Sequence, residues 1–376
     1  APWQPAPWQA GSWTPAPPAP APWAPAAWGP PPWAPGPWVP GPWGWAPVAQ
    51  PYPPRWLPPG TPPHDEPQPF LLAMRSRTWR WWRPALGLLL IVVVYAVAAV
   101  LTLVLGGVSV VLLGGLDVAG TDPEMAVPGF LLIVNLVTAV AIPVVWLAWG
   151  AVHGMRIGWS SSVLGRLRWR LFPAYVGLAL LTIGMSIGLS LLFDLGDAWD
   201  ATGPVSSYGW IVVVVLLTTP LQSAAEEYLF RGYLSQAVAG WVRRPRAGAI
   251  TAALVSAALF SLAHLPPDLP SFLFYASMGL AASAVVWLTG GLEAAIALHT
   301  VNNVVIFVLV GALGEDATNA TQSPGAVPWF DVLLAVVALS AFVGLVARSQ
   351  RRRRPATSTA AVDLRPPFPA VPVPAH

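Results

Sequence analysis

The sequence predicts an all-α, polytopic membrane bundle of about eight transmembrane helices, preceded by a disordered tail rich in proline and tryptophan. Of its 376 residues, 55% are hydrophobic and only 9% are charged, whereas a soluble domain carries about 25% charged residues. The stretch from Pro84 to Leu116 contains no Asp, Glu, Lys or Arg, and about 20 consecutive apolar residues suffice to cross a bilayer. The 45 prolines crowd into the tails. A soluble globular protein is therefore excluded.

Residues 1–74 are expected to form a disordered cytosolic tail. Tryptophans recur with a five-residue period, at positions 3, 8, 13, 23, 28, 33, 38 and 43. Proline fixes φ and lacks the amide donor, so neither helix nor sheet is expected, and a loose polyproline-II chain is. Such a chain is either a plain solvated tail or the ligand of a partner that binds proline motifs. Next, Arg75–Arg83 mixes arginine with tryptophan, as at a membrane surface.

Residues 75–347 form the predicted transmembrane bundle. We expect spans near residues 85–115, 126–150, 171–193, 208–240, 248–265, 271–290, 292–313 and 327–347. At 1.5 Å per residue, the fourth span would be about 50 Å long, against about 30 Å of hydrocarbon. This span is therefore expected either to break near Pro220 or to protrude. Residues 348–376 follow as a cytosolic tail, first basic and then proline-rich.

The loops alternate in charge. Basic loops lie at residues 156–170, 243–246 and 348–354, and the loops between them are acidic. Because arginine concentrates on the cytoplasmic side of membrane proteins, we expect a multi-pass protein of the cell membrane with both termini in the cytoplasm.

Charged and imidazole side chains inside the spans are candidates for function, because burying them in lipid is costly. Glu227 and Arg231 are four residues apart and can pair on one helix face. Glu226 is rotated by about 100° from Glu227 and is expected to stay free. His299 and Asn303 again share a face.

His264 ends a helix at a depth similar to that of Glu226, because the two residues lie at nearly equal distances from the basic loop 241–247. His153 is expected at the membrane interface. His64 and His376 lie in the tails, with no partner in view.

Glu226, His264, His299 and Asn303 are sufficient for peptide hydrolysis by activated water. A carboxylate in a low-dielectric site can act as general base, an imidazole can hold the water, and an imidazole with an amide N–H can hold the oxyanion. Two histidines and a carboxylate also form a known zinc set. Glu226, His264 and His299 would then be the ligands, so the cofactor is either zinc or none. There is no cysteine for a disulfide, a thiolate site or a nucleophile.

Three motifs in this order resemble the CPBP family of CaaX-type intramembrane proteases and bacteriocin-processing or immunity proteins, also called Abi proteins. They are Glu226-Glu227-x-x-x-Arg231, Phe260-x-x-x-His264 and His299-x-x-x-Asn303. The resemblance covers roughly residues 170–345 and is tightest over 220–305. It implies a membrane bundle with a cavity and an endopeptidase, glutamate- or metal-dependent, that acts on a membrane-attached protein or peptide. Glu226 would activate water with His264, and His299 and Asn303 would stabilise the oxyanion.

Other functions remain as alternatives. Glu226, Glu227 and Arg231 alone fit a structural ion-pair network, and a histidine at a helix end often only bonds the backbone. A non-catalytic immunity or scaffolding protein of the same fold is the main rival. A transporter should show paired inverted halves, whereas the polar residues here gather in the second half of the chain. The net charge of +3 is small, and no nucleic-acid partner is expected.

Overall fold

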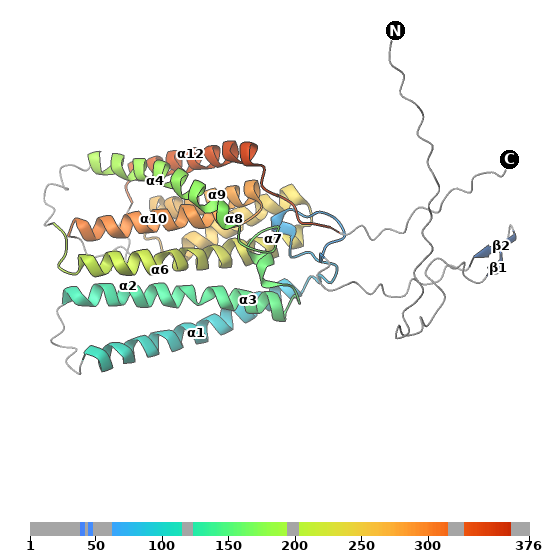
Figure 1. The fold of residues 1–376 in the computed structure, drawn as a ribbon, viewed down its shortest axis with the longest axis horizontal. Coiled ribbons are helices and arrows are strands. Elements are labelled where there is room, and N and C mark those ends of the chain that lie inside the picture. The colour runs from blue at the N-terminus through green and yellow to red at the C-terminus, as the bar shows by residue number, and fades with distance from the viewer. Residues whose placement is uncertain are drawn as a thin grey trace, which may run out of the picture. The chain divides into compact units, whose positions relative to one another are not determined.

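The computed structural model describes residues 38–41, 44–47, 62–114, 123–193, 203–314 and 327–361. The chain divides into two units, residues 1–59 and 60–376. Figure 1 shows the helices of the second unit.

The first unit contains a short hairpin, which corrects the expectation that the tail excludes sheet. Strands β1 (Trp38–Gly41) and β2 (Gly44–Pro47) pair antiparallel, and Pro40 and Pro47 each lie opposite a tryptophan. Residue pairs in such a ladder alternate between hydrogen-bonded and non-hydrogen-bonded. The Trp38–Pro47 and Pro40–Trp45 pairs are two positions apart, so both can be non-hydrogen-bonded pairs. Neither proline then needs the amide N–H that it lacks. The predicted polyproline-II tail and its partner otherwise lie outside the described residues.

The second unit is a multi-pass membrane bundle. Eight helical segments among the described residues are long and apolar enough to cross a membrane, which confirms the predicted count. They are Arg83–Val108, Pro128–Ala151, Trp169–Phe193, Tyr208–Val242, Pro245–Ala263, Leu269–Thr289, Glu293–Ala312 and Trp329–Arg353. Each overlaps one predicted span, because uninterrupted apolar length is a local property of the sequence.

Helices α6 and α10 pack against each other and link the other helices of the bundle. The α-helices are α1 (Arg83–Gly114), α2 (Pro123–Ala139), α3 (Ala141–Ala151), α4 (Phe172–Phe193), α6 (Tyr208–Leu229), α7 (Ser235–Val242), α8 (Pro245–Ala263), α9 (Leu269–Thr289), α10 (Glu293–Ala312) and α12 (Trp329–Arg353). Short 3-10 turns lie at Phe70–Leu72, Ile157–Ser160 and Trp169–Leu171. Helix α6 packs against α2 and α10, α10 against α4 and α9, and α9 against α8 and α12 (Figure 1). The functional motifs on α6, α8 and α10 are thereby brought to neighbouring helices.

The fourth span does not break at Pro220. Helix α6 continues through this proline to Leu229, a π-helical segment follows at Phe230–Leu234, and α7 completes the span. Membrane helices tolerate proline where neighbouring groups satisfy the freed backbone. The irregularity lies instead at the π-helical segment, where the hydroxyls of Ser235 and Ser256 donate to the Phe230 carbonyl at 2.8 and 3.3 Å. Single π turns are frequent at functional sites.

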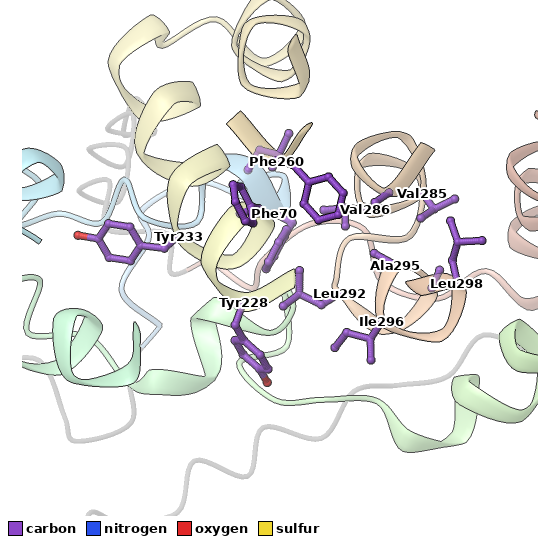
Figure 2. Packing of buried hydrophobic residues seen from close by; sticks show 14 of the residues in the cluster. Phe70, Tyr228, Tyr233, Phe260, Val285, Val286, Leu292, Ala295, Ile296 and Leu298 are labelled. Atoms are coloured by element: carbon purple, nitrogen blue, oxygen red, sulfur yellow. The ribbon is translucent and has the colours of Figure 1, made fainter. Parts of the chain in front are cut away.

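The apolar core lies around the π-helical segment and the start of α10. Figure 2 shows Tyr228 near Leu292 and Ile296, and Tyr233 and Phe260 belong to the same cluster of buried residues. Lipid tails are as apolar as these side chains, so close van der Waals packing, rather than the hydrophobic effect, favours helix association here.

Residues 62–74 pack on the helical unit, so this unit begins before residue 74, where the sequence analysis ended the tail. Phe70, Leu71 and Leu72 are all buried. The expectation that His64 lacks a partner is wrong, because its Nε2 lies 2.7 Å from the Ala73 carbonyl oxygen. Its ring also packs edge-on against a tryptophan, Trp159, at 5.2 Å. Burial lowers the pKa of His64 below its usual value.

The start of the predicted C-terminal tail is also packed. Helix α12 extends to Arg353, beyond the expected end at residue 347. The amide of Thr359 donates to the Gln68 carbonyl at 2.8 Å, and the Thr359 hydroxyl accepts from the Gln68 amide at 3.0 Å. Residues near both ends of the described helical unit therefore meet. Sequence patterns do not reveal such a pairing, because it depends on the tertiary fold.

Candidate active site

Glu227 is the centre of a buried ion-pair network on the motif-bearing helices. Its Oε1 lies 2.9 Å from Nη1 of Arg231 and 2.9 Å from Nδ1 of His299 on α10. The side chains of Glu227 and Arg231 are 1% and 0% exposed. This network connects α6, the π-helical segment and α10. Removal of one partner would leave an unpaired buried charge, which is strongly destabilising.

Arg231 also connects α9 to the network. Its Nη2 donates to the Gly279 carbonyl at 3.1 Å, and its guanidinium carbon lies 4.8 Å from the centre of the Phe260 ring, within range of a cation–π contact. Gly279 allows the close approach of α9 to α8. A Cβ atom at this position would lie 2.8 Å from the Cα of Ala257, too close for any other residue without movement.

Glu226 has a different bonding partner from Glu227, although both carboxylates lie next to the His299 ring. Its Oε1 accepts a hydrogen bond of 2.5 Å from Nε2 of Gln222. Its Oε2 is buried and has no hydrogen-bond partner among the described residues. The nearest charged or imidazole partner of Oε2 is Nε2 of His299 at 3.7 Å, which is beyond direct hydrogen-bond distance. One oxygen of this carboxylate is thus held, and the other is free to take a proton.

His299 lies between the two glutamates. Because Glu227 accepts from both Arg231 and His299, it is an ionised acceptor, and Nδ1 of His299 carries the proton of that bond. Nε2 is then directed toward Glu226. The ring is buried, and Phe260 meets it edge-on at 5.6 Å. The geometry thus assigns different partners to the two ring nitrogens.

His264 caps the C-terminus of α8. Its Nδ1 lies 2.8 Å from the Phe260 carbonyl oxygen, which can only accept, so Nδ1 is the donor. Its ring stacks on Tyr275 of α9 at 4.4 Å with an interplanar angle of 20°. The lone pair of the neutral ring is therefore on Nε2. This nitrogen can accept a hydrogen bond from water.

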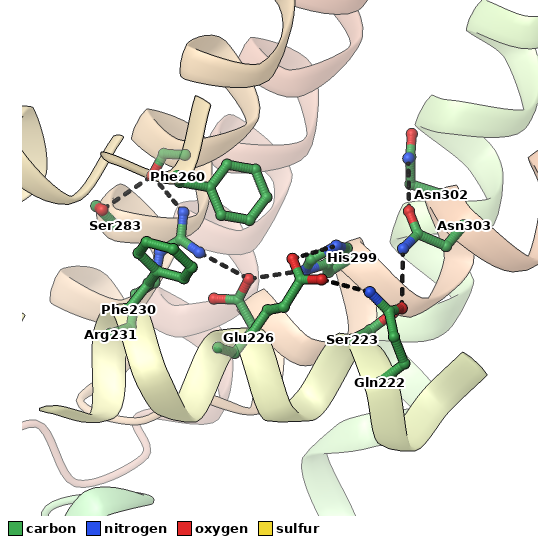
Figure 3. Close-up of polar contacts among 12 residues, drawn as sticks. Gln222, Ser223, Glu226, Phe230, Arg231, Phe260, Ser283, His299, Asn302 and Asn303 are labelled. Carbon is green, nitrogen blue, oxygen red and sulfur yellow. Dashed lines mark hydrogen bonds and ion pairs between the residues drawn. The ribbon is translucent and has the colours of Figure 1, made fainter. Parts of the chain in front are cut away.

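Asn303 reaches the carboxylate indirectly, through Gln222. Its Nδ2 lies 3.1 Å from Oε1 of Gln222, and Asn302 Nδ2 lies 3.1 Å from Oδ1 of Asn303. Figure 3 shows these amides in a row that ends at Glu226. The structure therefore brings the amide of Asn303 into the same polar network as the carboxylate and His299.

Two cavities meet at the candidate site. One has a volume of about 660 Å³, extends toward Asp331 on α12 and is lined by His299. The other, of about 590 Å³, is lined by Glu226 and Gln222 and extends toward Tyr95 on α1. Both are lined by His264, Phe274, Tyr275, Asn302, Asn303 and Ile306. All four residues with expected catalytic functions therefore line at least one of the two cavities.

Gln222 and Tyr275 are site residues that the sequence analysis missed. Gln222 precedes Glu226 by four residues and so shares its helix face, a signal that could have revealed it. Tyr275 had no such signal, because its contact with His264 joins α8 and α9 through the tertiary fold.

Glu293 and His153 lie outside this site and are buried. The guanidinium of Arg168 pairs with both carboxylate oxygens of Glu293, at 2.9 Å from Nε and 2.6 Å from Nη2, which anchors the start of α10. His153 is 3% exposed and its Nε2 lies 2.9 Å from the Tyr233 hydroxyl. It lies two residues beyond the end of α3, and its position at the membrane interface stays a prediction. Burial, with a smaller contribution from Arg83, lowers the pKa of His153 to about 4.

The residues considered as zinc ligands, Glu226, His264 and His299, do not converge on one point. Within the part of the chain that the structure describes, no group of three His, Cys, Asp or Glu residues is placed to hold a metal ion. As placed, these side chains do not fit a zinc ion, and we derive no step through one.

The fold and the site together define a class, a multi-pass membrane protein with carboxylates and imidazoles buried among its helices. Within this class, residues 208–305 match the Rce1-like family, described as type II CAAX prenyl endopeptidase Rce1-like. All six polar motif residues lie inside the matched range. This match supports the CaaX protease, or CPBP, family and confirms at the family level the resemblance seen in the motifs.

One curated relative is the uncharacterized protein YyaK of Bacillus subtilis (strain 168). The two proteins are 23% identical over 177 residues, which are 45% of this chain and 58% of the relative. The chain therefore covers less than two thirds of the length of that relative. No solved structure matches the chain significantly.

Proposed function

We propose that the chain is an intramembrane endopeptidase that hydrolyses a peptide bond in a membrane-attached protein or peptide. The free oxygen of Glu226 carries the proposal. It is buried, has no hydrogen-bond partner among the described residues and lies 3.7 Å from His299 beside the cavities. A carboxylate held by one oxygen and free at the other suits a general base that acts on water.

In the first step, Oε2 of Glu226 takes one proton from a water molecule, whose other hydrogen is held by Nε2 of His264. The water oxygen bonds to the carbon of the scissile carbonyl, and the carbonyl oxygen becomes an oxyanion. The oxyanion accepts hydrogen bonds from an N–H of Asn303 and from Nε2–H of His299. To donate from both nitrogens, His299 must be an imidazolium, whose charge the Glu227 carboxylate compensates once Glu226 has taken the water proton.

In the second step, Glu226 gives its proton to the nitrogen of the leaving group. The carbon–nitrogen bond breaks, which leaves a carboxylic acid and an amine and restores the Glu226 carboxylate. No serine, threonine or cysteine forms a covalent intermediate in this scheme. The buried pair of Glu227 and Arg231 holds the His299 ring in place throughout, through the bond to Nδ1.

We further propose that the protein lies in the cell membrane with both termini in the cytoplasm. The loops rich in arginine, at residues 156–170, 243–246 and 348–354, alternate with loops that contain no arginine. Eight spans would return the chain to the side on which it began. The bias of arginine toward the cytoplasmic side supports this orientation.

Cleavage of a quenched, fluorescent prenylated peptide by the purified protein in detergent tests the proposal. We expect turnover by the unaltered chain and none by Glu226→Gln, because the amide cannot accept the proton. Glu66→Gln makes the same chemical change at an exposed position and should cleave normally. If a folded Glu226→Gln protein kept its turnover, the mechanism would be wrong. If this variant kept full function in cells without any cleavage, the alternative of an immunity or scaffolding protein would be favoured.

A further inference from the structure

Gln222 joins two groups to which the proposed mechanism gives separate tasks. Its Nε2 donates to Oε1 of Glu226 at 2.5 Å, and its Oε1 accepts from Nδ2 of Asn303 at 3.1 Å. We propose that Gln222 is a positioning residue, which holds the general base and the oxyanion donor in one hydrogen-bonded chain across α6 and α10. This inference rests on the proposed function and adds to it a residue outside the three motifs.

The negative charge of Glu226 sets the direction of the whole chain. A carboxylate only accepts hydrogen bonds, so the NH₂ group of Gln222 must face it. The Gln222 oxygen then faces Asn303, which must present its own NH₂ group. Asn303 in turn presents its oxygen to Asn302, whose Nδ2 lies 3.1 Å away. One charged group therefore orients three side-chain amides, and the Ser223 hydroxyl adds a bond of 3.2 Å to the Gln222 oxygen.

This arrangement decides which atoms remain available for reaction. Gln222 occupies Oε1 of Glu226, so Oε2 is the oxygen left for the water. An amide NH₂ has two hydrogens, and Asn303 gives one to Gln222, so the other remains for the oxyanion. Without Gln222, the Glu226 carboxylate and the Asn303 amide could each rotate, and the free oxygen and the free N–H would no longer be held toward one substrate bond.

Gln222→Met tests the proposal, because methionine is also unbranched and of similar size but makes no comparable hydrogen bond. We expect kcat for the quenched prenylated peptide to fall by about 100-fold, as for a small misplacement of reacting groups, with KM nearly unchanged. Should this variant fail to fold, Gln222→Asn keeps an amide but shortens it by one methylene, and the same loss of kcat is expected.

Gln236→Met is the matched control. Gln236 is also a buried glutamine of the same span, and it accepts from the Met74 amide at 3.1 Å and donates to the Trp159 carbonyl at 3.2 Å. It therefore holds structure away from the reacting groups. Its replacement should lower the melting temperature while leaving kcat of the folded protein unchanged.

A double-mutant cycle separates positioning from general stabilisation. Because Gln222 acts partly through Asn303, adding Gln222→Met to Asn303→Ala should reduce kcat by much less than about 100-fold. If the two substitutions acted independently, as for a general structural effect, their losses of kcat would multiply. Full multiplication of the two losses, or a normal kcat in folded Gln222→Met, would overturn the inference. Either result leaves the proposed function standing as long as the unaltered chain cleaves and Glu226→Gln does not.

Discussion

The carboxylates of Glu226 and Glu227 are adjacent in sequence but have different surroundings. The Oε1 atom of Glu227 bonds Arg231 and His299, and its side chain is 1% exposed. The Oε1 atom of Glu226 bonds Gln222, and its side chain is 16% exposed and lines a cavity. Oε2 of each carboxylate has no hydrogen-bond partner among the described residues. The rotation of about 100° between neighbouring helical residues produces this division. A single short segment thus supplies both a structural anion and a candidate base.

Arg231→Ala should destabilise the protein by about 3–5 kcal/mol, because it leaves the Glu227 charge buried without its arginine. A lower melting temperature in detergent and a lower abundance in membranes would measure this. Arg156→Ala removes an exposed arginine and should change neither. The double variant Glu227→Gln/Arg231→Met should recover part of the stability, since no buried charge then remains unpaired. Normal stability of Arg231→Ala would contradict the ion-pair interpretation.

The buried His153 predicts that stability falls in acid. Its pKa is about 4 in the folded protein against 6.5 unfolded, so the unfolded chain binds the proton more tightly. Stability is therefore complete above about pH 6.5 and is lost as the pH falls toward 4, by about 3 kcal/mol in total. His153→Gln can still hydrogen-bond Tyr233, and its melting temperature should fall less between pH 7 and pH 5. An identical pH dependence in both proteins would refute this assignment.

At the scale of elements, the contact between α8 and α9 determines how closely Arg231 is held. Gly279→Ala should force these helices apart, because the added Cβ would lie 2.8 Å from Ala257. We expect a loss of about 1–3 kcal/mol and lower activity, since the Gly279 carbonyl also accepts from Arg231. Gly184→Ala in α4 adds the same group where nothing lies within 4 Å, and its melting temperature should not fall. Equal melting temperatures for the two variants would argue against close packing.

The helices and the site motifs could be predicted from the sequence, because apolar length and residues four apart are local properties. That Glu226 does not share the helix face of Glu227 and Arg231 also follows from local helix geometry. The position of Gln222 between Glu226 and Asn303 could not be derived, because it requires the spacing of α6 and α10. Of the two alternatives for the fourth span, a break near Pro220 or a protruding helix, the structure excludes the break. The sequence could not decide between them, because it does not place the neighbouring groups that can satisfy a helix at a proline.

At the scale of the whole molecule, we expect the stability of the helical unit to depend on residues 70–72, which the sequence predicts as part of a disordered tail. Deleting residues 1–59 should leave the melting temperature and the activity of this unit unchanged. Deleting residues 1–72 removes the buried Phe70, Leu71 and Leu72 and should cost on the order of 3–6 kcal/mol. Melting curves of the two shortened chains in the same detergent make the comparison. Equal melting temperatures would show that this segment contributes nothing to stability.

The bonds between Gln68 and Thr359 have a consequence for biosynthesis, because these residues are 291 positions apart. Arg168, which anchors the first turn of α10 through Glu293, also donates to the Ala356 carbonyl at 2.9 Å. Helices enter the bilayer one after another while the ribosome is still translating, but these contacts can form only once residues 356–359 have emerged from it. The first turn of the helix that bears His299 therefore gains this additional contact only after helix α12 has been synthesised.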